Sequence, residues 1–92
     1  MKRLVVRPGG RLSLQSHRRR WEHWTVASGE ATVTVGEIVR AMTRGQSIDI
    51  QLGERHRLEN FGSVDVEVIE IQFGDYLGED DIIRHDDVYN RA

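Results

Sequence analysis

Four side chains of this 92-residue chain carry nitrogen or oxygen donors at spacings that suit a metal ion: Gln15, His17, Glu22 and His56. Gln15 and His17 are two residues apart, so on a strand both side chains point to the same face. Glu22 can return to that face after a short turn, and His56 would close the site from a later segment. An amide oxygen, two imidazoles and a carboxylate suit Zn, Mn, Fe, Co or Ni, with positions left for water or substrate. The alternative is that the two histidines are hydrogen-bonded polar residues without a metal.

These residues fall at fixed offsets within two glycine-bounded segments. The segments read Gly9-x5-Gln15-x-His17-x4-Glu22-x6-Gly29 and Gly45-x5-Gln51-x-Gly53-x2-His56-x3-Asn60. Together they resemble the two-part signature of the cupin superfamily, in which a histidine is usual at position 15 and a proline at position 51. The resemblance implies a small β-barrel that holds a divalent metal. Gly53 fits a tight turn that lets His56 point inward.

Other stretches are similar to the C-terminal domain of type II phosphomannose isomerases. Residues 78–91 read GEDDIIRHDDVYNR, where that family often ends in GEDDIVRxxDxYGR, and residues 13–17 read SLQSH, like its SLQxH stretch. A glutamine at position 15 is usual in that family, so Gln15 is no defect there. The resemblance covers about residues 8–91 and implies interconversion of mannose 6-phosphate and fructose 6-phosphate with a divalent metal. Nothing in the sequence resembles the guanylyltransferase domain that precedes this domain in many such proteins, so we expect a freestanding isomerase-like cupin.

The chain departs from that family at several positions. Arg18 and Arg19 stand where histidines are usual, and Gln51 and Phe61 stand where prolines are usual. The metal ligands are unchanged, whereas pocket shape and substrate can differ. Three functions therefore stay open: a metal-dependent sugar-phosphate isomerase, a non-catalytic cupin that binds a sugar or small metabolite, and, ranked last, a cupin oxygenase that uses iron.

An aldose–ketose isomerase needs a base that moves a proton between C1 and C2, an electrophile, and a cation for the phosphate. Arg84, in the family-like tail, is the first choice for contact with phosphate or enediolate, and Arg20 and Arg57 are weaker candidates. Glu70 is the predicted base, because it ends an otherwise apolar strand face and burial raises the pKa of a carboxyl. The alternative for Glu70 is an ion pair with an arginine across the barrel.

Composition limits the class of protein. A net charge of −2 argues against a nucleic-acid partner, and the absence of cysteine removes disulfides and thiolate ligands. No apolar run approaches the roughly 18 residues that a membrane span needs, and residues 1–7 are too short and charged for a secretory signal, so a cytoplasmic protein is expected. A core of this size is marginal for a monomer, so we expect a homodimer through a sheet face or edge.

The pattern of apolar residues predicts an all-β fold: a single small cupin domain, a jelly-roll-like β-barrel, over residues 1–92. Alternating and β-branched runs predict strands at 11–15, 21–27, 30–35, 38–42, 47–52 and 64–73, with turns between them. Residues 76–89 are the only candidate for helix, and they are too acidic and irregular for more than a turn or two.

Overall fold

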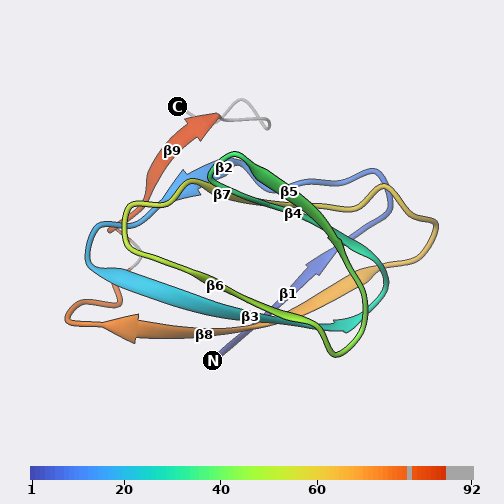
Figure 1. Cartoon of the computed structure of the whole chain (residues 1–92), viewed down its shortest axis with the longest axis horizontal. Coiled ribbons are helices and arrows are strands. Elements are labelled where there is room, and N and C mark those ends of the chain that lie inside the picture. Colours follow the sequence, from blue (N-terminus) through green and yellow to red (C-terminus); the bar gives the residue numbers. More distant parts are fainter. Residues whose placement is uncertain (79, 87–92) are drawn as a thin grey trace.

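Two antiparallel β-sheets pack face to face in the computed structural model, which describes residues 1–78 and 80–86 (Figure 1). One sheet has the strand order β1 (Lys2–Val6), β8 (Val66–Gly74), β3 (Arg20–Ser28) and β6 (Ser47–Ile50). The other has the order β5 (Ile38–Met42), β4 (Ala31–Val35), β7 (His56–Glu59), β2 (Leu14–Ser16) and β9 (Ile83–Asp86). The described residues contain no helix, and hence none long and apolar enough to cross a bilayer. The predicted all-β, jelly-roll-like fold is confirmed.

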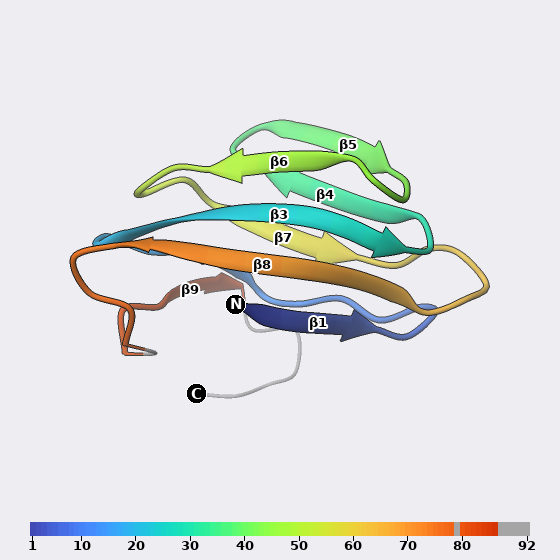
Figure 2. The ribbon, with the colours of Figure 1, turned by 90° about the horizontal axis from the view of Figure 1, so that it is seen from below.

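The hydrophobic core lies between the two sheets and comes from strict alternation along their strands. β3 and β8, the longest strands, run side by side in register from Arg20 opposite Gly74 to Val26 opposite Val68 (Figure 2). Every second residue of each strand faces the other sheet, as the period of a β-strand requires. Burial of each such aliphatic side chain is worth about 1.5–3 kcal/mol. The buried apolar residues are Val6, Trp24, Val26, Ala31, Val33, Met42, Ile50, Leu58, Val66 and Val68.

The same inward-facing rows become polar toward one end of the sandwich. On β3, Arg20 and Glu22 precede the core residue Trp24 on the same face, and all three are buried. On β8, the buried Glu70 is in register with Trp24. On the opposite sheet, the buried His56 begins β7. Because buried polar groups are costly unless they are paired, this end of the molecule is where a functional site is expected.

Two glycines shape the backbone beside the site, one through a tight turn and one through a close approach. Gly53 has a φ of 78° and donates its amide hydrogen to the carbonyl of His17 at 2.7 Å, which confirms the tight turn expected before His56. Gly74 ends β8 with a φ of 152°, and a Cβ there would overlap the carbonyl of Arg19. Any larger residue at position 74 would therefore separate the end of β8 from the loop that carries His17.

Most predicted strands are present, with shifted ends. The prediction for 38–42 coincides with β5, whereas the strand predicted at 11–15 is β2, and Arg11 forms only an isolated bridge with Glu59. Strands β1, β7 and β9 were not predicted, because they are short and contain charged residues. Residues 76–89 were the only candidate region for helix, and the described residues of that region contain none; β9 pairs with β2 there, while residues 79 and 87–89 lie outside the described part.

Candidate metal centre

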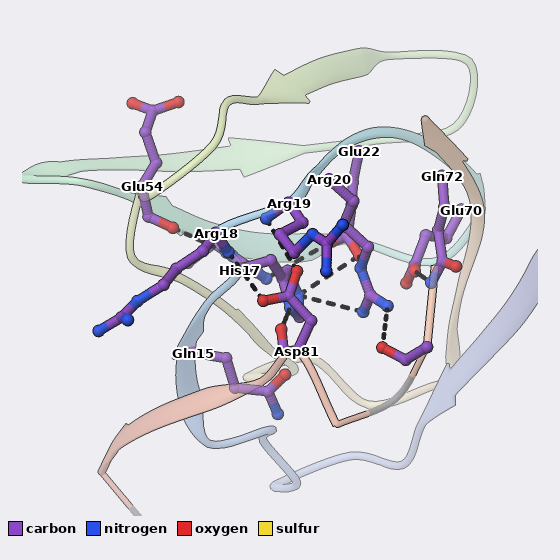
Figure 3. Close-up of polar contacts among 12 residues, drawn as sticks. Gln15, His17, Arg18, Arg19, Arg20, Glu22, Glu54, Glu70, Gln72 and Asp81 are labelled. Atoms are coloured by element: carbon purple, nitrogen blue, oxygen red, sulfur yellow. Dashed lines mark hydrogen bonds and ion pairs between the residues drawn. The ribbon is translucent and has the colours of Figure 1, made fainter. Parts of the chain in front are cut away.

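Three of the four predicted ligands converge at the polar end of the sandwich. His17 follows β2, Glu22 lies on β3, and His56 begins β7, so both sheets contribute. His17 Nε2 lies 3.4 Å from one oxygen of the Glu22 carboxylate, and His56 Nε2 lies 3.5 Å from the other. One donor atom from each residue lies within 4.8 Å of the other two. Figure 3 shows Glu22 and His17 pointing into the same space.

Backbone carbonyls fix which ring nitrogen faces this space. His17 Nδ1 lies 2.7 Å from the carbonyl oxygen of Asp81, and His56 Nδ1 lies 3.1 Å from that of Glu54. A carbonyl oxygen can only accept a hydrogen bond, so each Nδ1 carries the proton and each Nε2 presents a lone pair. Both lone pairs are directed toward the Glu22 carboxylate, itself an acceptor. Such a set of converging acceptors suits a cation, and a carbonyl behind a ligating imidazole is a common support of metal sites.

Burial keeps both imidazoles neutral. It lowers the pKa of His56 to about 4, and the hydrogen bond to the Glu54 carbonyl only partly offsets this effect. Burial also lowers the pKa of His17, with a smaller contribution in the same direction from the positive charge of Arg20. Metal binding requires unprotonated imidazole. Near neutral pH, therefore, neither ligand has to lose a proton before it binds a metal.

Arg20 places a guanidinium inside the same cluster. Its side chain is only 3% exposed, and its Nε donates a hydrogen bond to Glu22 at 3.2 Å. A second nitrogen of the guanidinium lies 3.3 Å from His17 Nε2, and a third donates to the carbonyl of Gly78 at 3.5 Å (Figure 3). Sequence reasoning ranked Arg20 below Arg84. Its spacing of two residues from Glu22 on a strand was the signal that it faces the site.

Gln15 lies on the wall of the cavity that contains the three ligands, a space of about 180 Å³. Its backbone is in register with His56 across β2 and β7. The amide nitrogen of Gln15 donates to Ser13 Oγ at 2.9 Å, so its amide oxygen is the atom that would ligate a metal. Ligation by Gln15 stays a prediction.

Glu70 lines the same cavity and is 5% exposed. Burial raises the pKa of the Glu70 carboxyl, and the neighbouring charge of Glu22 raises it further. Gln72 donates its side-chain amide to Glu70 at 2.5 Å, which stabilises the charged form. On its own strand face, Glu70 thus pairs with the side-chain amide of Gln72. The alternative considered from the sequence was an ion pair with an arginine. The position and the raised pKa both suit a group that exchanges a proton within the cavity.

The cationic side chains around the cavity lie at different depths relative to it. Arg84 is exposed on β9, in register with Gln15, and is absent from the residues that line the cavity. Arg57 follows His56 on β7 and borders the cavity. Lys2 also borders it, from β1, where it is in register with Glu70. Sequence reasoning missed Lys2, because residues 2–6 were not predicted to form a strand.

Comparison with known proteins identifies the family of this chain. The family described as mannose-6-phosphate isomerase C-terminal matches residues 1–87. The chain belongs to this family. Over all 92 of its residues it is 55% identical to the xanthan biosynthesis protein XanB of Xanthomonas campestris pv. campestris, of which it covers 20%. It is 49% identical to a mannose-1-phosphate guanylyltransferase of Klebsiella pneumoniae, over 98% of this chain and 19% of the relative. The chain thus spans about a fifth of the length of the curated relatives it matches.

Solved structures confirm the cupin fold of this family member. An uncharacterized conserved protein with a double-stranded β-helix domain from Klebsiella pneumoniae superposes with a TM-score of 0.78 over 89% of this chain and 66% of that protein. The two sequences are 23% identical, so the similarity concerns the fold. Other similar structures include a cupin domain. The two-sheet arrangement is therefore that of a cupin.

Proposed function

We propose that this cupin is a metal-dependent sugar-phosphate isomerase that interconverts mannose 6-phosphate and fructose 6-phosphate. The observation that carries the proposal is the convergence of the neutral imidazoles of His17 and His56 on the Glu22 carboxylate, in a cavity that also holds Glu70. Membership in the mannose-6-phosphate isomerase C-terminal family supports the substrate class.

A divalent metal fits these residues, because the donor set offers two imidazole nitrogens and a carboxylate without thiolates. His17, Glu22 and His56 would hold it, with the amide oxygen of Gln15 as a fourth ligand. When bound, Zn, Mn, Co, Ni or Fe acts as a Lewis acid toward oxygens of the sugar. The lowered pKa values of both histidines favour occupancy at neutral pH.

Glu70 is suited to move the proton. In the aldose-to-ketose direction, the reaction takes a proton from C2 and delivers one to C1, while the hydroxyl proton at O2 is lost and one is gained at O1. A carboxyl with a raised pKa accepts and returns a proton near neutral pH more readily than an exposed one. Glu70 lies on the cavity wall opposite β7, so a sugar between the sheets would be within its reach.

Cationic side chains would bind the oxyanion and the phosphate. Arg20 presents N–H groups deep in the site, where an enediolate oxygen would develop negative charge. Lys2 borders the cavity, and Arg84 is exposed on β9 beside Gln15. We propose that Arg84 and Lys2 contact the phosphate, because this group would extend from the buried centre toward solvent.

The contacts of Arg20 also favour a second candidate function. The guanidinium already donates hydrogen bonds to atoms of Glu22 and His17, so the cluster is held together by a protein cation. A cupin stabilised in this way can bind a sugar or small metabolite without turnover. An iron-dependent oxygenase, the remaining alternative, has no separate support among the described residues.

A metal analysis combined with a coupled assay tests the proposal. Purified protein is stripped with a chelator, reloaded with each of the five metals, and assayed for fructose 6-phosphate formed from mannose 6-phosphate. Turnover that requires metal supports the isomerase. Binding of mannose 6-phosphate by calorimetry without turnover favours the binding module, and oxygen consumption favours the oxygenase.

We also propose that the cupin forms a homodimer through the outer face of the four-stranded sheet. Trp21 on β3 stacks on Phe73 of β8, with ring centroids 4.2 Å apart. Phe73 and the adjacent Ile71 on the same face are each 39% exposed. Aromatic residues that remain exposed on a sheet are common at protein interfaces. Sedimentation analysis should therefore give a dimer that Trp21→Ala weakens.

A further inference from the structure

Asp81 contacts the loop that carries His17 through both its main chain and its side chain. Its carbonyl oxygen accepts the hydrogen bond from His17 Nδ1 at 2.7 Å. Its carboxylate accepts hydrogen bonds from the main-chain amides of Arg18 at 3.2 Å and Arg19 at 2.9 Å (Figure 3). Three consecutive residues of one loop are therefore bonded to a single residue that lies more than sixty positions later in the chain.

The hydrogen bonds to the Asp81 carboxylate determine where the Asp81 carbonyl lies. With both oxygens of the carboxylate held by successive amides, the backbone of Asp81 has little freedom to move away from the loop. Each carboxylate oxygen accepts one of these two hydrogen bonds, as a charged carboxylate does well.

The carbonyl in turn determines what His17 presents to the metal centre. Because the carbonyl requires a proton on Nδ1, Nε2 is left with its lone pair, 3.4 Å from the Glu22 carboxylate. The nearby guanidinium of Arg20 agrees with this tautomer, since it can only donate toward Nε2. With the proton on Nε2 instead, His17 could not be a ligand at that atom.

Neighbouring contacts hold the same segment against the loop but do not reach a ligand. The side chain of Arg19 lies 3.3 Å from Asp75 and over the ring of Tyr76. The Tyr76 hydroxyl donates to Asp80. Because the Asp81 bonds use main-chain amides, they are independent of the side chains of Arg18 and Arg19, and the arginines that replace the family's usual histidines leave them intact.

We propose that Asp81 is a positioning residue of the metal centre, which fixes the tautomer and ring orientation of His17 through its own clamped carbonyl. The proposal rests on the metal site of the proposed function, but not on the isomerase reaction. Removal of a group that orients a ligating histidine in this way typically weakens metal binding about 10–100-fold.

The test compares Asp81→Asn with Asp80→Asn, which removes the same charge one residue away from the loop contacts. Long-range 1H–15N spectra of the metal-free protein should show a single Nδ1–H tautomer for His17 in the wild type and in Asp80→Asn. In Asp81→Asn one acceptor oxygen becomes an NH2 group, so we expect mixed tautomers and about 10–100-fold weaker Zn²⁺ binding by calorimetry. Unchanged tautomer and zinc affinity in Asp81→Asn would overturn the proposal.

The wild-type spectrum keeps the test decisive even where Asp81→Asn folds poorly, because an Nε2–H tautomer in the wild type would refute the role of Asp81 without any variant. The result is also separable from the proposed reaction. Zinc binding that depends on Asp81, without isomerase turnover, would exclude the isomerase and leave the positioning role in place. A wild-type protein that binds none of the metals would refute the metal centre and this inference with it.

Discussion

Arg20 and Glu22 lie two residues apart on β3 and share a buried hydrogen bond, from Arg20 Nε to Glu22 Oε2 at 3.2 Å. The same guanidinium approaches His17 Nε2 at 3.3 Å. Arg20 therefore contacts donor atoms of two of the three residues that would hold a metal. A bound metal and the guanidinium compete for these atoms, so substitutions at Arg20 and at the ligands should have opposite effects on metal affinity.

Arg20→Ala should retain or tighten zinc binding while it removes turnover. The substitution leaves Glu22 buried without its cation, which destabilises a protein by about 3–5 kcal/mol when no metal is present, and zinc should restore this loss. Without the guanidinium to stabilise the oxyanion, turnover should fall about 100-fold or more. Calorimetry, thermal unfolding with and without zinc, and the coupled assay measure these effects, with Arg18→Ala as the control. Loss of zinc binding in Arg20→Ala would instead mean that Arg20 holds the ligands in position.

His56→Ala should abolish zinc binding and turnover together. The buried imidazole contributes one of three converging donors, and two remaining donors form a much weaker site. His23→Ala is the matched control, because His23 is bonded to Asp49 on the outer face and its side chain is 36% exposed. Calorimetry with Zn²⁺ on chelator-treated protein should show a loss of at least about 100-fold for His56→Ala and little change for His23→Ala. Equal losses in the two variants would speak against the assigned centre.

The metal-free protein should lose stability as the pH falls from about 6.5 to about 4. The pKa of His56 is about 4 in the folded protein, against 6.5 for an ordinary histidine. Between these values the unfolded chain binds a proton that the folded protein does not, so acid favours unfolding, by up to about 3 kcal/mol. The lowered pKa of His17 acts in the same direction, and the raised pKa of Glu70 acts in the opposite one.

Urea unfolding at several pH values measures this dependence. His56→Gln lacks the titrating ring, so its stability should change less between pH 6.5 and 4 than that of the wild type. A wild-type stability that stays constant through this range would show that His56 titrates normally in the folded protein.

The fold and the convergence of three candidate ligands could be predicted because they depend on spacing. His17, Glu22 and His56 fall at offsets that two short β segments and a glycine turn bring together, whatever the neighbouring side chains are. The alternation in 21–27 and 64–73 likewise gave β3 and β8 nearly to their ends. Periodicity is the strongest signal that a single sequence offers.

The surroundings of the ligands could not be predicted, because they depend on contacts between distant segments. The pairing of β9 with β2 and the hydrogen bonds of Asp81 to residues 17–19 join parts of the chain more than sixty residues apart. The short strand β1 was not predicted, so its register with β8, which places Lys2 beside Glu70, could not be predicted either. The burial of Arg20 follows from its pairing with Glu22, which alternation permits but does not require.

Arg84→Ala should weaken the binding of phosphorylated sugar without affecting the metal. Arg84 is exposed on β9 and lies outside the residues that line the cavity, so it can contact only a group that extends out of it. We expect KM for mannose 6-phosphate to rise about 10-fold with kcat little changed, since a contact made equally in ground and transition states affects KM. Arg40→Ala, an exposed substitution on β5, is the control. An unchanged KM in Arg84→Ala would leave Lys2 as the phosphate contact.

Glu70→Gln should remove turnover while metal and substrate still bind. Glutamine keeps the shape and the hydrogen-bonding capacity of the side chain but cannot exchange a proton at the carboxyl, so kcat should fall about 10²–10⁴-fold with KM and zinc affinity little changed. Glu67→Gln is a matched control on the same strand, because Glu67 lies on the outer face of β8 and pairs with the exposed Arg3. Measured kcat, KM and zinc affinity for both variants separate the roles. A Glu70→Gln variant that turns over normally would assign the proton transfer to another group, and one that loses zinc binding would make Glu70 part of the metal centre.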